Sequence, residues 1–245
     1  MKKRLISLLL FVAVILSVFA AVSCDEKPQN NDDRKDDMYL ILVNKSNPAG
    51  KSYSPDGLVD LDKSYTNASK AISLEEKTAE AAISMIDAMR RAGIDNVTVT
   101  SGYRTYEYQE QLFARYIAEE KAKHPTWSNE EVRAEVLTYS AAPGKSEHQT
   151  GFCLDLITDE MVGLWNYGSE TPNNPYDKGF AETAAFEWLK EHAHEYGFIL
   201  RFPEDKTEIT GYSYESWHYR YVGVEHAKNI HEEGITLEEY LENGK

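Results

Sequence analysis

The sequence Ser146-Glu147-His148-Gln149-Thr150-Gly151-Phe152-Cys153-Leu154-Asp155 decides how the rest of this chain is interpreted. It is matched later in the chain by Glu215-Ser216-Trp217-His218. Together the two segments hold two imidazoles and one carboxylate that suit a divalent metal ion, and a second carboxylate stands three residues before the last imidazole. These are the side chains that a catalytic zinc site uses.

A catalytic zinc ion usually takes three protein ligands and leaves its fourth position to water, the pKa of which falls to about 7. A nearby carboxylate that is not a ligand can then take a proton from that water. We therefore expect His148, Asp155 and His218 to bind one zinc ion, with Glu215 as the base. Taken alone, each residue type is more often a hydrogen-bonded surface or capping residue, so the prediction depends on the joint pattern.

The pattern Ser-x-His-x-x-Gly-x-x-x-Asp followed by Glu-x-Trp-His resembles the VanY-type D-alanyl-D-alanine carboxypeptidases, zinc peptidases that trim peptidoglycan stem peptides. The resemblance runs from about Tyr39 to the C-terminus. It departs from the family at Ser216, where proline is common. The resemblance implies an LAS-type metallopeptidase fold of the α+β class, with a central antiparallel sheet flanked by helices and the zinc ion at its open face.

A second family signature, Ser101-Gly102-Tyr103-Arg104, follows a predicted strand, and its glycine permits a sharp turn at the strand end. The resemblance implies that Arg104 faces the scissile carbonyl oxygen and stabilises the charge that develops there. It also implies that Ser146 hydrogen-bonds the terminal carboxylate of the substrate. The remaining residues expected to contact the substrate or to pack around the site are Ser101, Tyr103, Gln109 and Trp217.

Cys153 stands inside the metal segment, at a position where the family generally has a small residue. It would be either a fourth metal ligand or a small buried hydrophobic residue. We favour the second interpretation because the surrounding alternation indicates a strand and because cysteine commonly packs in cores.

The first residues predict export from the cytoplasm. A basic start at residues 2–4 precedes an apolar run, which indicates a secretory signal over residues 1–23, although a membrane-spanning helix has a similar pattern. The run ends in Ala21-Val22-Ser23-Cys24, which resembles a bacterial lipobox and implies lipidation of Cys24. Residues 24–37 are too polar to form a core, so we expect a disordered tether before a catalytic domain over residues 38–245.

The net charge of the chain limits the classes of molecule that it can bind. The chain has a net charge of −15, and loss of residues 1–23 would remove three basic and no acidic residues, which gives −18. Such a surface argues against nucleic acid and against binding of anionic lipid by charge. We expect a monomer that is attached to the membrane by its lipid and acts outside the cytoplasm on peptidoglycan stem peptides.

Hydrophobic periodicity and turn residues predict alternating helices and strands. Helices are expected over residues 68–92, 106–123, 128–140, 181–196, 225–232 and 237–242, and strands over residues 39–45, 97–100, 152–157, 198–202 and 214–222. Residues 158–180 are rich in Asn, Gly, Pro and Tyr, which indicates an irregular segment that covers part of the cleft.

The last predicted strand sets a geometric condition. Residues 215 and 218 would point to opposite faces of a regular strand. If both serve one site, Glu215 must precede the strand proper or sit at a bulge.

These inferences predict a zinc metallocarboxypeptidase that removes the last D-alanine from a stem peptide. Related proteins with the same motif include L,D-carboxypeptidases, which cut a tetrapeptide stem, and endopeptidases, which cut cross-links. A non-catalytic wall-binding lipoprotein and a secreted zinc hydrolase for another short peptide are the remaining alternatives.

Overall fold

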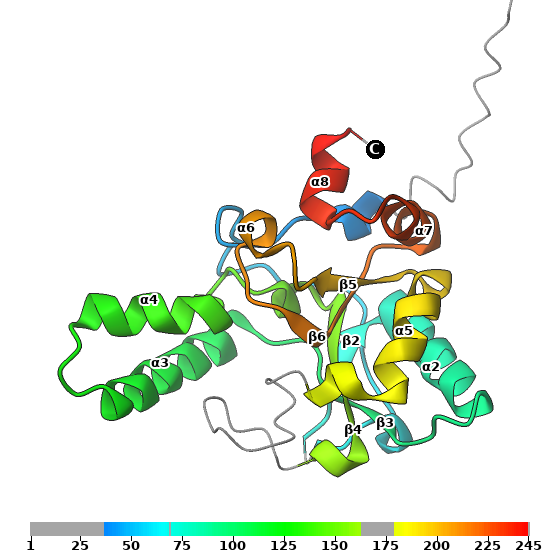
Figure 1. Cartoon of the computed structure of the whole chain (residues 1–245), viewed down its shortest axis with the longest axis horizontal. Coiled ribbons are helices and arrows are strands. Elements are labelled where there is room, and N and C mark those ends of the chain that lie inside the picture. The colour runs from blue at the N-terminus through cyan, green and yellow to red at the C-terminus, as the bar shows by residue number, and fades with distance from the viewer. Residues whose placement is uncertain (1–36, 69, 163–178, 245) are drawn as a thin grey trace, which may run out of the picture.

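The computed structural model describes residues 37–68, 70–162 and 179–244 (Figure 1). The predicted signal segment, the lipidation of Cys24, nearly all of the tether and most of the irregular segment 158–180 lie outside the described residues. Within the described part of the chain, no helix has the length and apolar character needed to cross a membrane.

A four-stranded antiparallel sheet lies at the centre of the described domain. In spatial order its strands are β3 (Val97–Ser101), β4 (Cys153–Thr158), β6 (Glu215–Tyr221) and β5 (Phe198–Phe202). Helices flank this sheet, which confirms the expected α+β class (Figure 1).

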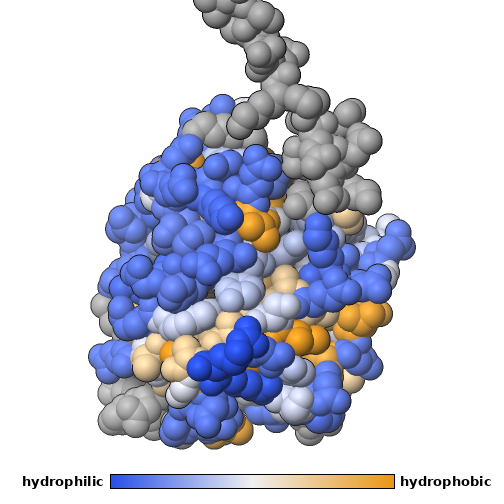
Figure 2. Space-filling model, turned by 90° about the vertical axis from the view of Figure 1, so that its right-hand side faces the viewer, coloured by the Kyte–Doolittle hydropathy of each residue, from blue (hydrophilic) through white to orange (hydrophobic). Residues whose placement is uncertain are grey.

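One face of the sheet is covered by α2 (Glu76–Arg91) and α5 (Ala184–His192). Because successive strand residues point to opposite faces, Leu154, Leu156 and Tyr219 turn together into the largest hydrophobic core. The outer surface over these two helices is mainly hydrophilic, with small hydrophobic areas between the charged side chains (Figure 2). The sheet face under α2 and α5 therefore forms the hydrophobic core, and polar side chains lie on the opposite face of the sheet.

The other face of the sheet carries polar side chains. Asp155 on β4 and His218 and Arg220 on β6 are buried there. A separate hydrophobic cluster under α7 (Val224–Glu233) and α8 (Leu237–Glu242) covers this face at β5. Polar groups on a buried sheet face must find partners within the protein, so this face is where specific polar contacts are concentrated.

A helical hairpin projects from the sheet (Figure 1). It consists of α3 (Tyr106–Lys123) and α4 (Asn129–Tyr139), which share a small hydrophobic cluster around Phe113 and Val136. Ser128 and Glu131 form a capping box at the start of α4. The base of this hairpin lies beside the polar face of the sheet and contributes to the site described below.

The remaining elements are short. They are β1 (Leu58–Asp60), β2 (Ser73–Glu75), α6 (Thr207–Thr210) and the 3₁₀ helices η1 (Asp37–Leu40), η2 (Lys63–Tyr65), η3 (Glu147–Thr150), η4 (Asp159–Met161), η6 (Phe180–Glu182) and η7 (Ala193–Tyr196).

Most predicted elements are confirmed within a few residues. The bounds of α3 agree with the prediction, and the predicted helix over 181–196 is divided into η6, α5 and η7 before Gly197. The predicted bulge is also present, because the pairing of β5 with β6 shifts between Leu200 and Phe202, and Glu215 is the first residue of β6.

The prediction of a strand over residues 39–45 is wrong. The chain forms η1 and then continues as loop and bends. The backbone carbonyls of Tyr39 and Ile41 accept hydrogen bonds from Arg220, and the Tyr39 ring packs edge-on against Phe152 and Tyr221. The apolar residues of this segment therefore reflect its anchoring to the sheet by side chains, not a ladder of strand hydrogen bonds.

The helix expected from Ala68 begins later, at Glu76. The preceding Ser73–Glu75 forms β2, which pairs antiparallel with β1. Glu75 is the N-cap residue, and its carboxylate accepts a hydrogen bond from the backbone nitrogen of Thr78 at 3.0 Å. Glu75 therefore sets the start of the helix as a capping residue and not as a residue of its first turn.

Gly102 allows the turn after β3 to pass close to β2. A Cβ atom at this position would lie 2.6 Å from the carbonyl oxygen of Ser73 and 2.8 Å from Cγ2 of Ile72. We expect Gly102→Ala to lower the free energy of unfolding by about 1–3 kcal/mol, because the backbone must shift to relieve the overlap.

Denaturant unfolding of the purified domain would measure this effect, with Gly50→Ala as the matched control. Gly50 is exposed, and no heavy atom lies within 4 Å of the place that a Cβ atom would take there, so its replacement should change stability by less than about 0.5 kcal/mol. Equal stabilities of the two variants would contradict the close approach at Gly102.

Candidate metal centre and active site

The register of the sheet places the predicted ligands side by side. Asp155 pairs directly with His218 across β4 and β6, and Ser101 pairs with Asp155 across β3 and β4. Side chains that stand opposite each other in an antiparallel pair have Cβ atoms about 4.5–5.5 Å apart. Two of the three predicted ligands, far apart in sequence, are thus neighbours on the polar face.

His148 reaches the same place from η3. Its Nδ1 atom lies 2.6 Å from the carbonyl oxygen of Gly102, and its own carbonyl accepts a hydrogen bond from the backbone nitrogen of Arg104 at 3.0 Å. Gly151 ends η3 with a positive φ of 74°, which turns the chain into β4. The two family motifs are therefore joined through the backbone at the point where His148 enters the site.

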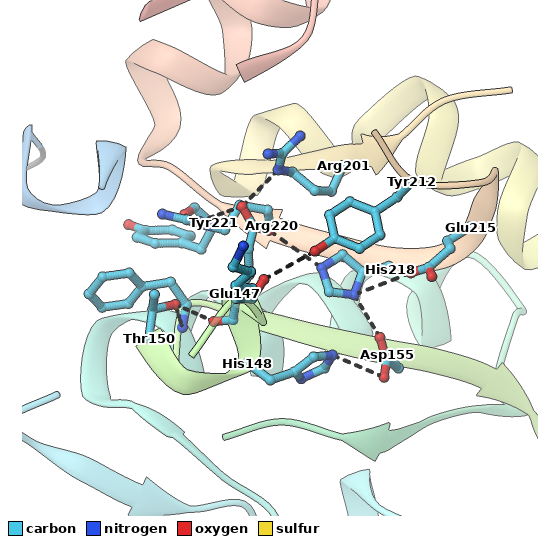
Figure 3. Close-up of polar contacts among 12 residues, drawn as sticks. Glu147, His148, Thr150, Asp155, Arg201, Tyr212, Glu215, His218, Arg220 and Tyr221 are labelled. Carbon is cyan, nitrogen blue, oxygen red and sulfur yellow. Dashed lines mark hydrogen bonds and ion pairs between the residues drawn. The ribbon is translucent and has the colours of Figure 1, made fainter. Parts of the chain in front are cut away.

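The three predicted ligands converge (Figure 3). Nδ1 of His218 lies 2.9 Å from Oδ1 of Asp155, and Nε2 of His148 lies 3.3 Å from Oδ2 of the same carboxylate. The two imidazole rings are 5.0 Å apart, and all three residues are at most 4% exposed. One nitrogen of each imidazole and the carboxylate between them thus face one another.

This donor set fits zinc. Two imidazoles and a carboxylate are among the usual protein ligands of a catalytic zinc ion, and each imidazole has its second nitrogen turned to an oxygen atom, as metal-bound histidines generally do. Burial would raise the pKa of Asp155, but the adjacent imidazoles hold it well below its usual range, so the carboxylate is ionised. His148, Asp155 and His218 would hold the ion.

Glu215 stands at the edge of this group. Its Oε2 atom lies 3.8 Å from Nδ1 of His218, and its side chain is 13% exposed. Burial raises the pKa of Glu215 to about 7, although the His218 imidazole opposes the shift. The bulge between β5 and β6 is what allows Glu215 and His218 to face the same side.

A cavity opens beside the predicted ligands. The sheet, η3 and the base of the α3–α4 hairpin all contribute to its wall. Residues expected to act on the substrate are brought together here, namely Arg104, Gln109, Ser146, Glu215 and Trp217. Trp217 lines the cavity and also belongs to the main hydrophobic core.

Two residues expected at the substrate do not line this cavity. Ser101 lies beside Arg104, and its Oγ atom accepts hydrogen bonds from Nε and Nη2 of that residue at 3.0 and 2.7 Å. Tyr103 lines a neighbouring hollow, and its hydroxyl lies 3.4 Å from that of Ser54. The geometry thus makes Ser101 a residue that orients Arg104.

Arg104 pairs with one of the predicted ligands in this structure. Its Nη2 atom lies 3.0 Å from Oδ2 of Asp155, and its side chain is 21% exposed. The guanidinium therefore stands at the cavity wall next to the metal centre.

Gln109 and Ser146 lie at the other side of the cavity. Nε2 of Gln109 donates to the carbonyl of Ala141 at 2.8 Å, which ties α3 to the segment before η3. Its buried Oε1 atom has no hydrogen-bond partner among the described residues. Gln109 therefore presents an acceptor, and Ser146 a hydroxyl, beside the predicted ligands.

Cys153 is closer to the site than the sequence interpretation expected. It is fully buried, and because it lies two residues before Asp155 on β4, it points to the same face. Its sulfur and one ring nitrogen from each of His148 and His218 all lie within 4.8 Å of one another. The thiol is therefore buried in the protein and also lies beside the two imidazoles.

Glu147 is a residue of the site that the sequence interpretation missed. It is 4% exposed and contacts His218 together with two fully buried arginines, Arg201 and Arg220. A usable signal was present in the sequence, because arginines within the predicted strands 198–202 and 214–222 require buried acidic partners.

Zinc binding tests which donor completes the centre. We expect Asp155→Ala to lose stoichiometric zinc because it removes the carboxylate between the two imidazoles. We expect Cys153→Ala to retain stoichiometric zinc, because the three proposed ligands His148, Asp155 and His218 stay intact. The metal content of purified protein, measured by atomic emission after dialysis, checks both. Loss of zinc from Cys153→Ala would show that the thiol is a ligand.

Comparison with known proteins agrees with this geometry. The family model for VanY, D-alanyl-D-alanine carboxypeptidase, matches residues 71–224. A D-alanyl-D-alanine carboxypeptidase of Enterococcus faecalis (strain ATCC 700802 / V583) is 38% identical over 206 residues, which cover 84% of this chain and 66% of the relative. The chain thus spans about two thirds of the length of that protein.

Solved structures of similar fold are also known. VanYB in complex with D-alanine-D-alanine has a TM-score of 0.68 and 36% identity, covering 85% of this chain and 99% of its own. A VanY D,D-pentapeptidase variant from a VanB-type resistance cassette, in complex with Zn(II), has a TM-score of 0.65 and 37% identity. The match covers 83% of this chain and 98% of the variant's chain. The LdcB LD-carboxypeptidase has a TM-score of 0.68 and 32% identity, and the match covers 85% of this chain and 88% of the LdcB chain.

The family match extends over more than half of this chain and includes both metal motifs. One of the similar structures holds zinc, and the donor set found here suits that ion. The chain therefore belongs to the VanY family of D-alanyl-D-alanine carboxypeptidases, and it is a zinc peptidase with the α+β fold of that family.

Proposed function

We propose that this protein removes the C-terminal D-alanine from peptidoglycan stem peptides in a zinc-dependent reaction. One observation carries the proposal: His148, Asp155 and His218 converge at a cavity wall, and the non-ligating carboxylate of Glu215 lies 3.8 Å from His218. The names of the VanY relatives support D-alanyl-D-alanine as the bond that is cut.

Zinc, when bound, supplies a Lewis acid that lowers the pKa of water and polarises a peptide carbonyl. The protein side chains supply the proton transfers. Glu215, beside the ligand His218, takes a proton from the attacking water and then gives a proton to the departing amine.

Arg104 would stabilise the charge that develops on the substrate carbonyl oxygen. Ser101 holds its guanidinium, and the guanidinium stands beside Asp155 at the cavity wall. A donor that is fixed before the reaction stabilises the developing charge without reorganisation at that moment.

The shape of the cavity supports cleavage at a chain end. The α3–α4 hairpin provides Leu112, Tyr116 and Tyr139, which form a wall next to the metal centre. A substrate whose chain stops there can turn its terminal carboxylate to the hydroxyl of Ser146, as the family resemblance implies.

The place of action follows from the substrate. Peptidoglycan stem peptides lie outside the cytoplasm, so the domain would act there, in the cell envelope. The lipobox-like Ala21-Val22-Ser23-Cys24 supports a lipid anchor at Cys24, followed by a polar tether that holds the domain away from the membrane. Firm attachment needs at least two acyl chains.

L,D-carboxypeptidase activity on tetrapeptide stems is the second candidate. It is favoured by the similarity to LdcB, whose TM-score of 0.68 equals that of VanYB. Purified protein should be offered pentapeptide and tetrapeptide stems in parallel, with and without a chelator. We expect release of D-alanine from the pentapeptide and its loss on chelation. Cleavage of the tetrapeptide alone would replace the proposal with the L,D activity.

The variant Glu215→Gln tests the proton transfer. It keeps the size of the side chain and removes its basicity, so we expect kcat to fall by at least about a hundredfold while zinc remains bound. Glu225→Gln, an exposed change in the first turn of α7, is the matched control and should keep full activity. Unchanged hydrolysis by Glu215→Gln would exclude Glu215 as the base.

A further inference from the structure

We propose that Glu147 is a positioning residue that determines which nitrogen of His218 faces the zinc ion, and that two buried arginines hold it in place. The inference depends on the ligand set proposed above. It concerns the residues behind the ligands: Glu147 holds His218 with Nδ1 toward the ion, and the carbonyl of Gly102 holds His148 with Nε2 toward it.

The geometry at His218 supports this assignment (Figure 3). Nδ1 of His218 faces Asp155 at 2.9 Å, and Nε2 faces Oε2 of Glu147 at 3.5 Å. Both Nε2 and Oε2 are buried and have no other hydrogen-bond partner among the described residues. Buried polar atoms are rarely left unpaired, so a small approach of the two groups would satisfy both.

The other oxygen of Glu147 is firmly held. Oε1 accepts hydrogen bonds from Nε of Arg201 at 2.8 Å and from Nη1 of Arg220 at 2.9 Å. Both arginine side chains are 0% exposed. Two buried guanidinium groups on one oxygen compensate the negative charge of the carboxylate. Glu147 is thus an ionised carboxylate with one free oxygen, and that oxygen is aimed at His218.

The arginines are themselves anchored by further partners. Arg201 makes two bonds to Glu238, at 2.8 and 2.6 Å, and Arg220 donates to the backbone carbonyls of Tyr39 and Ile41 at 2.7 and 2.8 Å. These anchors come from α8 and from η1 with the residue after it, outside the two metal motifs. They leave the arginines little freedom to follow a displaced Glu147.

An ionised carboxylate opposite Nε2 has a clear effect on the imidazole. It accepts a hydrogen bond from the protonated Nε2 and so favours the tautomer in which Nδ1 carries the lone pair that binds a metal. Phe202 stacks on the ring of His218 with centroids 5.0 Å apart, which limits rotation of the ring. The carbonyl oxygen of Gly102 lies 2.6 Å from Nδ1 of His148 and accepts a hydrogen bond from it. It therefore favours the other tautomer at His148, in which Nε2 carries the lone pair.

A purely structural role would explain these contacts less well. Buried ion pairs contribute little net stability, because desolvation of the charges offsets their attraction. Glu147 also places an oxygen toward His218 that neither arginine contacts.

The variant Glu147→Gln separates the two roles. The arginines require an acceptor, so the glutamine oxygen must face them and its amide nitrogen must face His218. That nitrogen is a donor, and it favours the wrong tautomer of His218. We expect the zinc dissociation constant to rise about 10–100-fold, measured by competition with a chromophoric chelator on folded protein.

Glu238→Gln is the matched control. It removes one buried carboxylate from the same arginine, Arg201, but the one that accepts from Nη1 and Nη2 and not the one that accepts from Nε. We expect this variant to unfold at a lower temperature and to bind zinc as the unaltered protein does. Equal zinc affinities of Glu147→Gln and the unaltered protein, or equal losses in the two variants, would overturn the inference.

A measurement on the unaltered protein keeps the inference testable if Glu147→Gln does not fold. ¹⁵N NMR of the zinc-loaded protein reports which ring nitrogen binds the metal and which carries a proton. We expect Nε2 of His218 to be protonated and Nδ1 to be bound, with the opposite arrangement at His148. Zinc on Nε2 of His218 would overturn the inference.

The variant His218→Ala distinguishes this inference from the proposed function. If it retains stoichiometric zinc, the proposed ligand set is wrong, and the role of Glu147 is wrong with it. If it loses zinc while Glu147→Gln binds zinc normally, the ligand set stands and only the role of Glu147 is excluded.

Discussion

The pairing register of β4 is the constraint on which the site depends. It sets Asp155 opposite His218 on one side and Ser101 on the other, so three strands contribute to a single row of polar side chains. Because side chains alternate along a strand, a slip by one residue would turn Asp155 into the hydrophobic core and bring Leu154 or Leu156 to the polar face. The core under α2 and α5 therefore fixes the register, and the register places the ligands.

Much of this arrangement could be predicted from the sequence, because it depends on local signals. The helices α3 and α4 begin at capping residues, Thr105 and Ser128, and α5 with η7 ends at Gly197 in the left-handed region. The bulge before His218 was predictable because two functional residues three apart cannot share a face of a regular strand. Motif spacing and strand alternation were sufficient to bring the predicted ligands together.

What the sequence interpretation missed depends on contacts between distant segments. Residues 39–45 have the composition of a strand, yet their partners are the Arg220 guanidinium and the rings of Phe152 and Tyr221, which no local pattern reveals. Cys153 is buried, as its chemistry predicts, but its position two residues before Asp155 also turns it toward the two imidazoles of the polar face. Local pattern predicts which elements form, but the occupants of a buried polar face depend on how those elements are paired.

The polar face also explains why so many charges lie inside a small domain. A sheet face that carries a candidate metal centre cannot be filled with hydrophobic side chains, so the space behind the proposed ligands needs groups that are themselves polar and fully paired. Arg201 and Arg220 fill that space from β5 and β6, and Glu147 lies between them and His218. Removing one member would leave a buried charge without its partner, which costs far more than the pair contributes. The elements that anchor these arginines, η1 and α8, therefore contribute to the stability of the polar face, although they lie outside both motifs.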